Sequence, residues 1–169
     1  MAEELFPPGA EDAFHKGLEA LGRRRHQEAI TLFHTAIDLE RQDDVNKNPK
    51  MQYLSYLGLA LVLAQGRSGE GLKLCEQAAR RDFFDPELFC NLGIVHLRHR
   101  QKALAFEAFR KGLALKPGHR RILEELERHE RRGDPVFSVL PRKHLLNRLA
   151  GTVRHRLRLL FGRGSTTPA

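Results

Sequence analysis

The sequence predicts an all-α fold assembled from three consecutive helix-turn-helix units. Three segments align with one another, 10–43, 51–85 and 86–119, with lengths of 34, 35 and 34 residues. Apolar residues recur within them at the spacing of amphipathic helices, and no stretch reads as a strand. The turn signals between the apolar stretches predict six helices, over 10–22, 26–40, 50–65, 69–81, 86–98 and 102–115.

Small residues recur at matching positions of the three units. The eighth position of every unit is glycine: Gly17, Gly58 and Gly93. A second small residue, followed one turn later by a larger apolar one, stands in the second half of each unit: Ala29 and Phe33, Gly71 and Cys75, Ala105 and Phe109. Two helices cross closely only where small residues lie at the contact. We therefore expect the two helices of each unit to pack tightly against each other.

This pattern resembles the tetratricopeptide repeat, in which a Leu-Gly pair, an Ala-x3-Phe segment and a closing proline recur. Leu57-Gly58 and Leu92-Gly93 match the pair, and Pro117 matches the proline. The family's tryptophan and tyrosine positions are occupied here by other residues: Ala13, Leu54 and Phe89, and Ala20, Leu61 and His96. The resemblance implies a right-handed helical solenoid of three tetratricopeptide-like units.

The remaining segments flank or separate the units. The segment HRRILEELERHERRG is amphipathic and predicts a helix that caps the open end of the stack. The stretch PVFSVLP is bounded by prolines that favour extended backbone. We therefore expect a repeat domain over 10–132, which includes the connection (44–50) and the capping helix (119–132). An N-terminal tail (1–9) precedes this domain. An extended strap (133–141), a basic amphipathic helix (142–163) and a disordered C-terminus (164–169) follow it.

Positive charge is concentrated at the C-terminal end. The formal net charge is +8, and positions 1–134 carry 22 basic residues against 21 acidic ones. Beyond them stand seven basic residues and no acidic one: Arg142, Lys143, Arg148, Arg154, Arg156, Arg158 and Arg163. Leucines and Val153 form a narrow apolar seam along the same predicted helix. Three interpretations remain open for it: packing of the seam on the repeat body, contact with an acidic protein or an anionic membrane, and contact with nucleic acid.

The sequence contains no recognisable catalytic or metal-binding arrangement. His96 and His99 stand three residues apart, but no nearby cysteine or carboxylate completes a set of ligands. The glycine-rich segment GRSGEG lacks the Lys-Ser or Lys-Thr ending that grips phosphate. Ser55 lies inside a predicted helix rather than in a nucleophile elbow. We therefore expect no enzymatic activity, no metal and no cofactor.

The resemblance also implies a site for a partner. In the family, the first helix of each unit lines a concave groove at about positions 2, 5, 9 and 12. Carried over to this chain, the peptide-binding groove comprises Phe14, Leu18, Leu21, Ser55, Leu59, Val62, Cys90, Ile94 and Leu97. Chaperone-binding members clamp a terminal carboxylate with Lys and Asn, and neither residue type stands at the corresponding groove positions of this chain. The apolar floor favours a partner's amphipathic helix or extended peptide; the alternative is that some of these residues only pack against neighbouring helices.

These observations predict a non-catalytic scaffold or adaptor that binds an unidentified protein in the cytoplasm. The N-terminal stretch lacks the basic start and apolar core of a secretory signal, and no apolar run of about 18 residues could span a bilayer. Cys75 and Cys90 lie in apolar helical patterns that suit buried thiols in a reducing compartment. The alternative function is electrostatic binding of nucleic acid or membrane through the basic helix. The architecture also resembles small chaperones of bacterial secretion systems.

Overall fold

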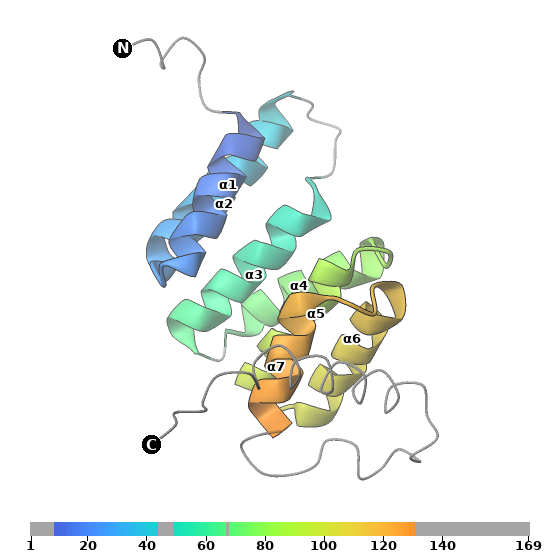
Figure 1. Cartoon of the computed structure of the whole chain (residues 1–169). Helices are drawn as coiled ribbons and strands as arrows, with labels where there is room; N and C mark the ends of the chain where they lie inside the picture. Colours follow the sequence, from blue (N-terminus) through green and yellow to red (C-terminus); the bar gives the residue numbers. More distant parts are fainter. Residues whose placement is uncertain (1–8, 44–48, 67, 131–169) are drawn as a thin grey trace, which may run out of the picture. The chain divides into compact units, whose positions relative to one another are not determined.

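The computed structural model describes residues 9–43, 49–66 and 68–130. This part of the chain contains seven α-helices and no strand. The helices are α1 (Ala10–Gly22), α2 (His26–Asp43), α3 (Met51–Gln65), α4 (Gly69–Arg81), α5 (Pro86–Arg98), α6 (Lys102–Leu115) and α7 (Arg120–Glu130) (Figure 1). The chain divides into two compact units, 1–123 and 124–169, with the division inside α7.

The predicted all-α fold is confirmed, with small differences at helix ends. The helices α1, α4, α5 and α6 begin and end where the sequence predicts, whereas α2 continues to Asp43 and α3 begins at Met51. The capping segment forms a helix over Arg120–Glu130, which starts one residue later than the predicted 119–132, and residues 131–132 lie outside the described residues. The predicted strap, basic helix and C-terminus lie outside the described residues.

Two helix starts follow from their capping residues. The Asp85 carboxylate accepts a hydrogen bond from the backbone N–H of Glu87 at 2.8 Å, and Pro86 occupies the first turn of α5. Proline suits this position because its missing N–H would have no partner there. The Ser68 hydroxyl accepts a bond from the N–H of Gly71 at 3.2 Å at the start of α4. Each cap satisfies a backbone donor that the helix itself leaves free.

The glycines at the eighth position of each unit let its two helices approach closely, as predicted. A Cβ added at Gly17 would lie 2.5 Å from the Phe33 ring, and one at Gly93 would overlap the Phe109 ring. In the second unit the glycine faces another glycine: a Cβ at Gly58 would lie 2.5 Å from the carbonyl oxygen of Gly71. The first and third units therefore fill the crossing with an aromatic ring, and the second brings two backbones together.

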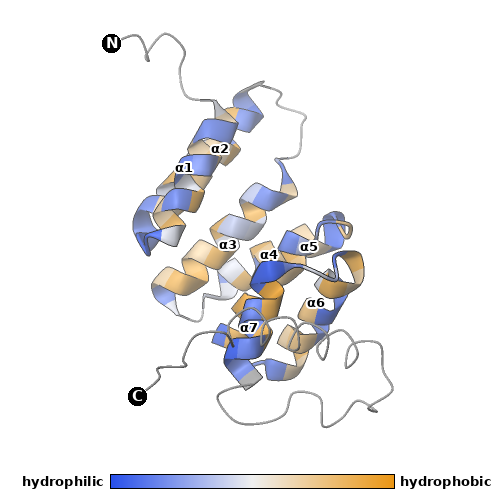
Figure 2. Cartoon of the chain, viewed as in Figure 1, coloured by the Kyte–Doolittle hydropathy of each residue, from blue (hydrophilic) through white to orange (hydrophobic). Residues whose placement is uncertain are grey.

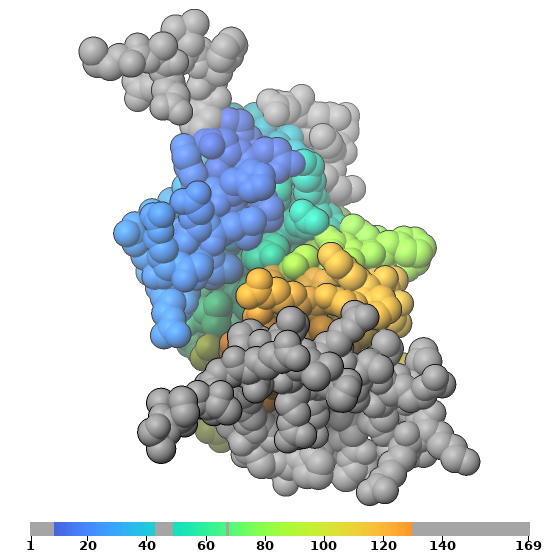
Figure 3. All heavy atoms as spheres, viewed as in Figure 1, coloured from blue at the N-terminus to red at the C-terminus, as the bar shows by residue number. Residues whose placement is uncertain are grey.

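The central helix of the repeat body is α3. It contacts α1, α2, α4 and α5, and its second half is coloured hydrophobic in Figure 2. Nine of its fifteen residues are buried. In the space-filling view the blue atoms of α1 lie beside the green atoms of α3 (Figure 3). None of the helices in the described ranges combines the length and apolar character needed to cross a bilayer.

Candidate protein-binding face

The predicted groove residues lie on the first helix of each unit, α1, α3 and α5. We call the surface formed by these three helices the first-helix face. Successive first helices contact each other, α1 with α3 and α3 with α5. Five of the predicted residues are buried: Phe14, Ser55, Leu59, Val62 and Cys90. Four stay half-buried: Leu18, Leu21, Ile94 and Leu97.

Phe14 is buried in a cluster of aromatic rings. Its ring centroid lies 4.7 Å from that of Tyr53, 5.5 Å from that of Tyr56 and 5.7 Å from that of Phe33. The Tyr56 contact is edge-to-face, which suits the charge distribution of the two rings. The cluster joins α1 and α2 to α3 across the first junction between units. The Phe14 ring therefore contributes to packing at this junction.

A second apolar cluster joins the middle of the face. Leu59 and Val62 of α3 are buried with Cys75 of α4 and Val95 of α5. The half-buried residues Leu21 of α1 and Ile94 of α5 pack against this cluster. The apolar floor therefore continues from the first unit to the third, and only its half-buried members present atoms to solvent.

Buried polar contacts fix Ser55 beneath the face. The Ser55 hydroxyl accepts a hydrogen bond from the Asn91 side-chain amide at 3.1 Å, which links α3 to α5. Its carbonyl oxygen accepts from the Cys75 thiol at 3.2 Å. Burial raises the pKa of Cys75 to about 12, although the hydrogen bond to Ser55 opposes the shift. The thiol therefore stays protonated, and Ser55 helps to hold α3, α4 and α5 together beneath the face.

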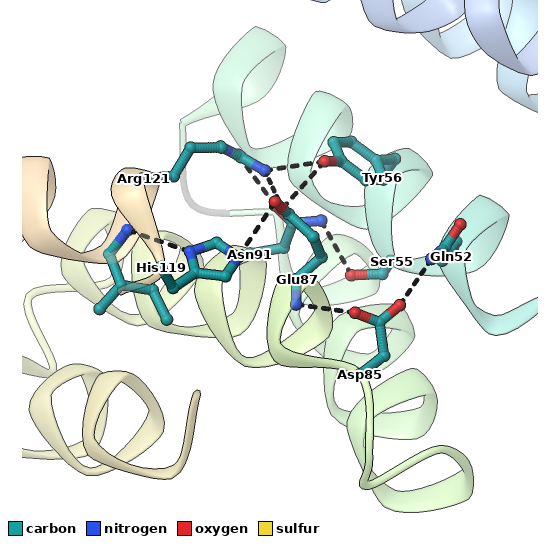
Figure 4. A network of polar contacts seen from close by, with 9 residues as sticks. Gln52, Ser55, Tyr56, Asp85, Glu87, Asn91, His119 and Arg121 are labelled. Carbon is teal, nitrogen blue, oxygen red and sulfur yellow. Dashed lines mark hydrogen bonds and ion pairs between the residues drawn. The ribbon is translucent and has the colours of Figure 1, made fainter. Parts of the chain in front are cut away.

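A polar cluster that the sequence did not predict lies beside this floor, around Arg121 in the first turn of α7 (Figure 4). The Arg121 guanidinium donates to the Tyr56 hydroxyl at 2.8 Å and to the side-chain oxygen Oδ1 of Asn91 at 3.1 Å. It also forms an ion pair with Glu87. It also lies over the Tyr56 ring, 5.5 Å from the centroid. The Tyr56 hydroxyl in turn donates to Glu87 at 3.0 Å. One arginine thus ties α7 to both α5 and α3.

His119 and Asp85 extend the cluster on either side. His119 Nε2 lies 3.1 Å from Glu87 Oε1, and the backbone N–H of Ile122 donates to His119 Nδ1 at 3.4 Å. Because Nδ1 accepts a bond, the ring proton of the neutral imidazole belongs on Nε2, where it points at Glu87. On the other side, the Gln52 amide donates to the Asp85 carboxylate at 2.6 Å.

Burial within the cluster raises the pKa of Tyr56 well above its usual value. The carboxylate of Glu87 acts in the same direction, whereas the charge of Arg121 opposes it. Tyr56 is therefore a neutral hydroxyl across the physiological range. The cluster is a hydrogen-bonded set in which the Arg121 cation pairs with the Glu87 carboxylate and the Asp85 carboxylate accepts two hydrogen bonds.

No metal site accompanies these groups in the described ranges. There, no three His, Cys, Asp or Glu side chains come together in a way that could hold an ion. His96, one of the two histidines weighed from the sequence, is buried, and its Nδ1 lies 2.7 Å from the Gln101 side-chain oxygen. The predicted basic tail falls outside the described residues: Arg142, Lys143, Arg148, Arg154, Arg156, Arg158 and Arg163.

Comparisons with known proteins agree with this architecture. The tetratricopeptide-repeat domain of Sgt2 from Aspergillus fumigatus matches 96% of this chain and 87% of its own, at 19% identity and a TM-score of 0.51. MamA of MSR-1 matches 93% of this chain and 82% of its own, at 18% identity and a TM-score of 0.51. The chain has a tetratricopeptide-repeat-like fold. No family model matches it, and no curated protein matches its sequence. At these identities the likeness concerns the fold alone.

The tetratricopeptide-like register explains where the polar cluster comes from. If α7 is aligned as the first helix of a fourth unit, Arg121 takes the second position, which Gln52 and Glu87 occupy in the preceding units. Side chains at this position of successive first helices lie near one another. Aligning α7 with the other first helices, instead of treating it only as a cap, would have predicted the cluster from the sequence.

Proposed function

We propose that the chain is a non-catalytic scaffold that binds a helix or peptide of a partner protein on its first-helix face. The observation that supports this function is the continuous apolar floor described above, which leaves Leu18, Leu21, Ile94 and Leu97 half-buried. Half-buried apolar side chains beside an ordered polar cluster suit a partner that contributes apolar anchors flanked by polar groups. The buried members of the predicted groove support the floor from beneath.

The arrangement limits the length of the partner segment. Leu18 and Leu21 belong to α1, Ile94 and Leu97 belong to α5, and α3 lies between them. Packed helices lie about 10 Å apart, so a segment that reaches both pairs spans roughly 20 Å. A helix covers this distance in about 13 residues. A partner helix of three to four turns with apolar residues on one face therefore fits.

Selection from a phage-displayed library of peptides of roughly 16 residues tests the proposal, because this length covers the span. We expect the full chain to select peptides with apolar residues at helical spacing. Leu21→Lys and Leu97→Lys variants should bind the selected peptides about tenfold or more weakly, since a lysine places a charge on the apolar floor.

Leu104→Lys is the matched control. Leu104 is 46% exposed on α6, the second helix of its unit, so the variant should bind the peptides as the original chain does. Circular dichroism checks that all three variants stay folded. Selected peptides that bind both groove variants as well as the control would overturn the proposed site.

A further inference from the structure

The turns that join the two helices of each unit lie at the C-terminal ends of the first helices α1, α3 and α5, and two of these turns are basic. Each turn spans three residues between helices: α1 to α2, α3 to α4 and α5 to α6. In this repeat fold successive first helices contact each other and run in the same direction (Figure 1), so the three turns lie at the same end of the helices. Figure 2 colours the α1–α2 turn hydrophilic.

Two of these turns are strongly basic. Residues 23–27 and 98–102 together contain six basic residues, two histidines and no acidic residue: Arg23, Arg24, Arg25, His26, Arg98, His99, Arg100 and Lys102. We call these two segments the basic turn edge. The middle turn contributes Gly66 and Ser68, and Arg67 lies outside the described residues. Positions 1–134 are close to neutral in total, yet the fold gathers these positive charges on one edge.

An arginine occupies the same unusual backbone conformation in both basic turns. Arg24 has φ 61° and Arg100 has φ 60°, in the left-handed region. In each turn the N–H of this arginine bonds to the carbonyl oxygen three residues back, and the next N–H bonds to the one five residues back. These two backbone hydrogen bonds form a Schellman motif, in which the residue in the left-handed conformation is usually glycine. The middle turn does place glycine, Gly66, at positive φ.

Arginine is unusual at this left-handed position, which indicates that its side chain has a role there. A side chain with a Cβ is disfavoured in the left-handed region, and the turn itself needs only glycine or asparagine. The same exception occurs in two turns that lie two units apart. Residues held in such conformations mark functional positions more often than ordinary ones. The guanidinium groups are therefore what these two positions supply.

The positive charges of the edge are weakly compensated. Within the described part of the chain, no carboxylate pairs with Arg24, Arg98 or Arg100. Arg23 and Arg25 pair with Glu19 at 3.7 Å and with Glu28 at 3.3 Å, through side chains that are about half or more exposed. Exposed pairs of this kind contribute little and are screened by salt. The edge therefore presents a positive potential to solvent.

The first basic turn also borders a hollow in the surface. Arg24, Arg25, His26, Gln27 and Glu28 line it, together with Ala64 from the last turn of α3. The α1–α2 turn is thus adjacent to the end of α3, where the middle turn begins. An anionic group in this hollow would be reached by side chains of two consecutive basic residues.

The chemistry of the edge favours phosphate groups along a chain. Guanidinium forks match phosphate and carboxylate groups with two parallel hydrogen bonds. Turns two units apart lie roughly 20 Å from each other, so a ligand that contacts both must be extended and must carry repeated charges. Nucleic acid carries one charge on every nucleotide whatever its sequence, whereas a peptide carries repeated charges only along a run of acidic residues. Membrane binding is strengthened by apolar side chains that insert, and the two basic segments contain none.

We propose that the basic turn edge binds the phosphate backbone of nucleic acid without reading its sequence. No aromatic ring stands in residues 23–27 or 98–102 to stack on a base. Contacts to phosphates alone position a protein on nucleic acid but carry no sequence information. This proposal concerns a surface other than the predicted basic helix and does not depend on the peptide-binding function.

Fluorescence anisotropy of a labelled poly(dT) strand of roughly 20 nucleotides, with the full chain, tests it. The variant Arg24→Asn with Arg100→Asn removes two charges while supplying a residue that tolerates the left-handed region. We expect about tenfold weaker binding at moderate salt, and a salt dependence shallower by about 1.4 in log-log slope, since each lost contact with single strands removes about 0.7. The double variant with lysine at both positions should keep most of the binding.

Two further variants locate the binding site. Arg80→Gln with Lys111→Gln removes two exposed charges from α4 and α6, and should leave binding within twofold of the original. Arg154→Gln with Arg156→Gln and Arg158→Gln tests the predicted basic helix. If the asparagine variant binds poly(dT) as the original chain does, or if only the tail variant loses affinity, the proposal is wrong.

The choice of ligand is tested in the same assay. Vesicles rich in phosphatidylserine and polyglutamate of matched charge serve as competitors for poly(dT). Weak competition by both supports nucleic acid. Tighter binding to vesicles that depends on Arg24 and Arg100 would reassign the edge to membranes, and tighter binding to polyglutamate would reassign it to acidic proteins; either result overturns the proposal. Thermal unfolding monitored by circular dichroism confirms that each variant is folded.

Discussion

The first-helix face and the basic turn edge use the same residue type in opposite ways. Arg121 on the face bonds to Glu87, Tyr56 and Asn91, and its charge is paired with a carboxylate. Arg24 and Arg100 on the edge have no carboxylate partner among the described residues and are held in a disfavoured conformation. An arginine whose donors are occupied orders the protein around it. An arginine whose donors face solvent is available to a ligand.

This difference predicts different consequences for mutations on the two surfaces. Changes on or beneath the face should lower the free energy of unfolding, because its side chains pack and bond to several helices. Changes on the edge should leave stability almost unaltered and change only binding.

Replacing Phe14 with alanine should cause the largest loss of stability. Its ring is buried against Phe33, Tyr53 and Tyr56, and removing a buried phenylalanine typically costs about 3–5 kcal/mol. Urea denaturation followed by circular dichroism measures the change. Phe84→Ala is the control, because Phe84 is 73% exposed and its loss should cost about 0.5 kcal/mol or less. Equal effects of the two variants would mean that the face is not supported by the aromatic cluster.

Replacing the paired and the unpaired arginine compares the two surfaces directly. Arg121→Gln leaves Glu87 and Asn91 short of a partner, and we expect a loss of about 1.5–2 kcal/mol in the free energy of unfolding. Arg24→Asn should change stability by about 0.5 kcal/mol or less, in either direction, since asparagine tolerates the left-handed region. Urea denaturation of both variants gives the answer. A larger loss from Arg24→Asn than from Arg121→Gln would contradict the comparison.

Alkaline pH should destabilise the repeat body through groups buried beneath the face. The pKa of Cys75 is raised from 9.0 to about 12, so above pH 9 the unfolded chain releases a proton that the folded chain retains. Stability therefore falls as pH rises from 9 toward 12, by about 1 kcal/mol between pH 9 and pH 10. The raised pKa of Tyr56 adds a further decrease above pH 10. Cys75→Ala should flatten the dependence between pH 9 and 10, and an unchanged slope in this variant would count against the assignment.

The smallest expected effect is the reaction of the two cysteine thiols with a thiol reagent in the folded chain. Cys75 and Cys90 are both fully buried, and the Cys75 thiol, whose pKa is raised to about 12, has almost no reactive thiolate at pH 8. We expect neither cysteine to react with Ellman's reagent in the folded chain, and both to react in urea. Rapid reaction of one thiol in native conditions would show that the core beneath the face opens.

Much of the fold could be predicted from the sequence because the repeat register fixes the helices. The matching glycines, including Gly17 and Gly93, mark the closest helix crossings, and Asp85-Pro86 marks the start of α5. These signals are local or repeat at a fixed interval. The amphipathic pattern predicted an apolar face for the capping segment, and Ile122 of this segment is buried.

The two surfaces were harder to predict, for different reasons. The family pattern places groove residues on the first helices but does not show how far neighbouring side chains cover them, and the rings around Phe14 fill that space. Arg121 looks like a solvated residue of a charged helix until α7 is aligned with the other first helices. The basic turn edge did not appear in charges counted along the chain, because it forms only when turns from the first and third units meet at one end of the helices.

We infer that the first-helix face and the basic turn edge bind different partners. Titrating the ¹⁵N-labelled full chain separately with poly(dT) and with a peptide selected by phage display, and following amide chemical shifts, tests this claim most directly. We predict that poly(dT) shifts amides in 23–27 and 98–102, whereas the peptide shifts those around Leu18, Leu59 and Ile94, further back along α1, α3 and α5. If both ligands perturb the same set of residues, the division into a protein-binding face and a nucleic-acid-binding edge is wrong.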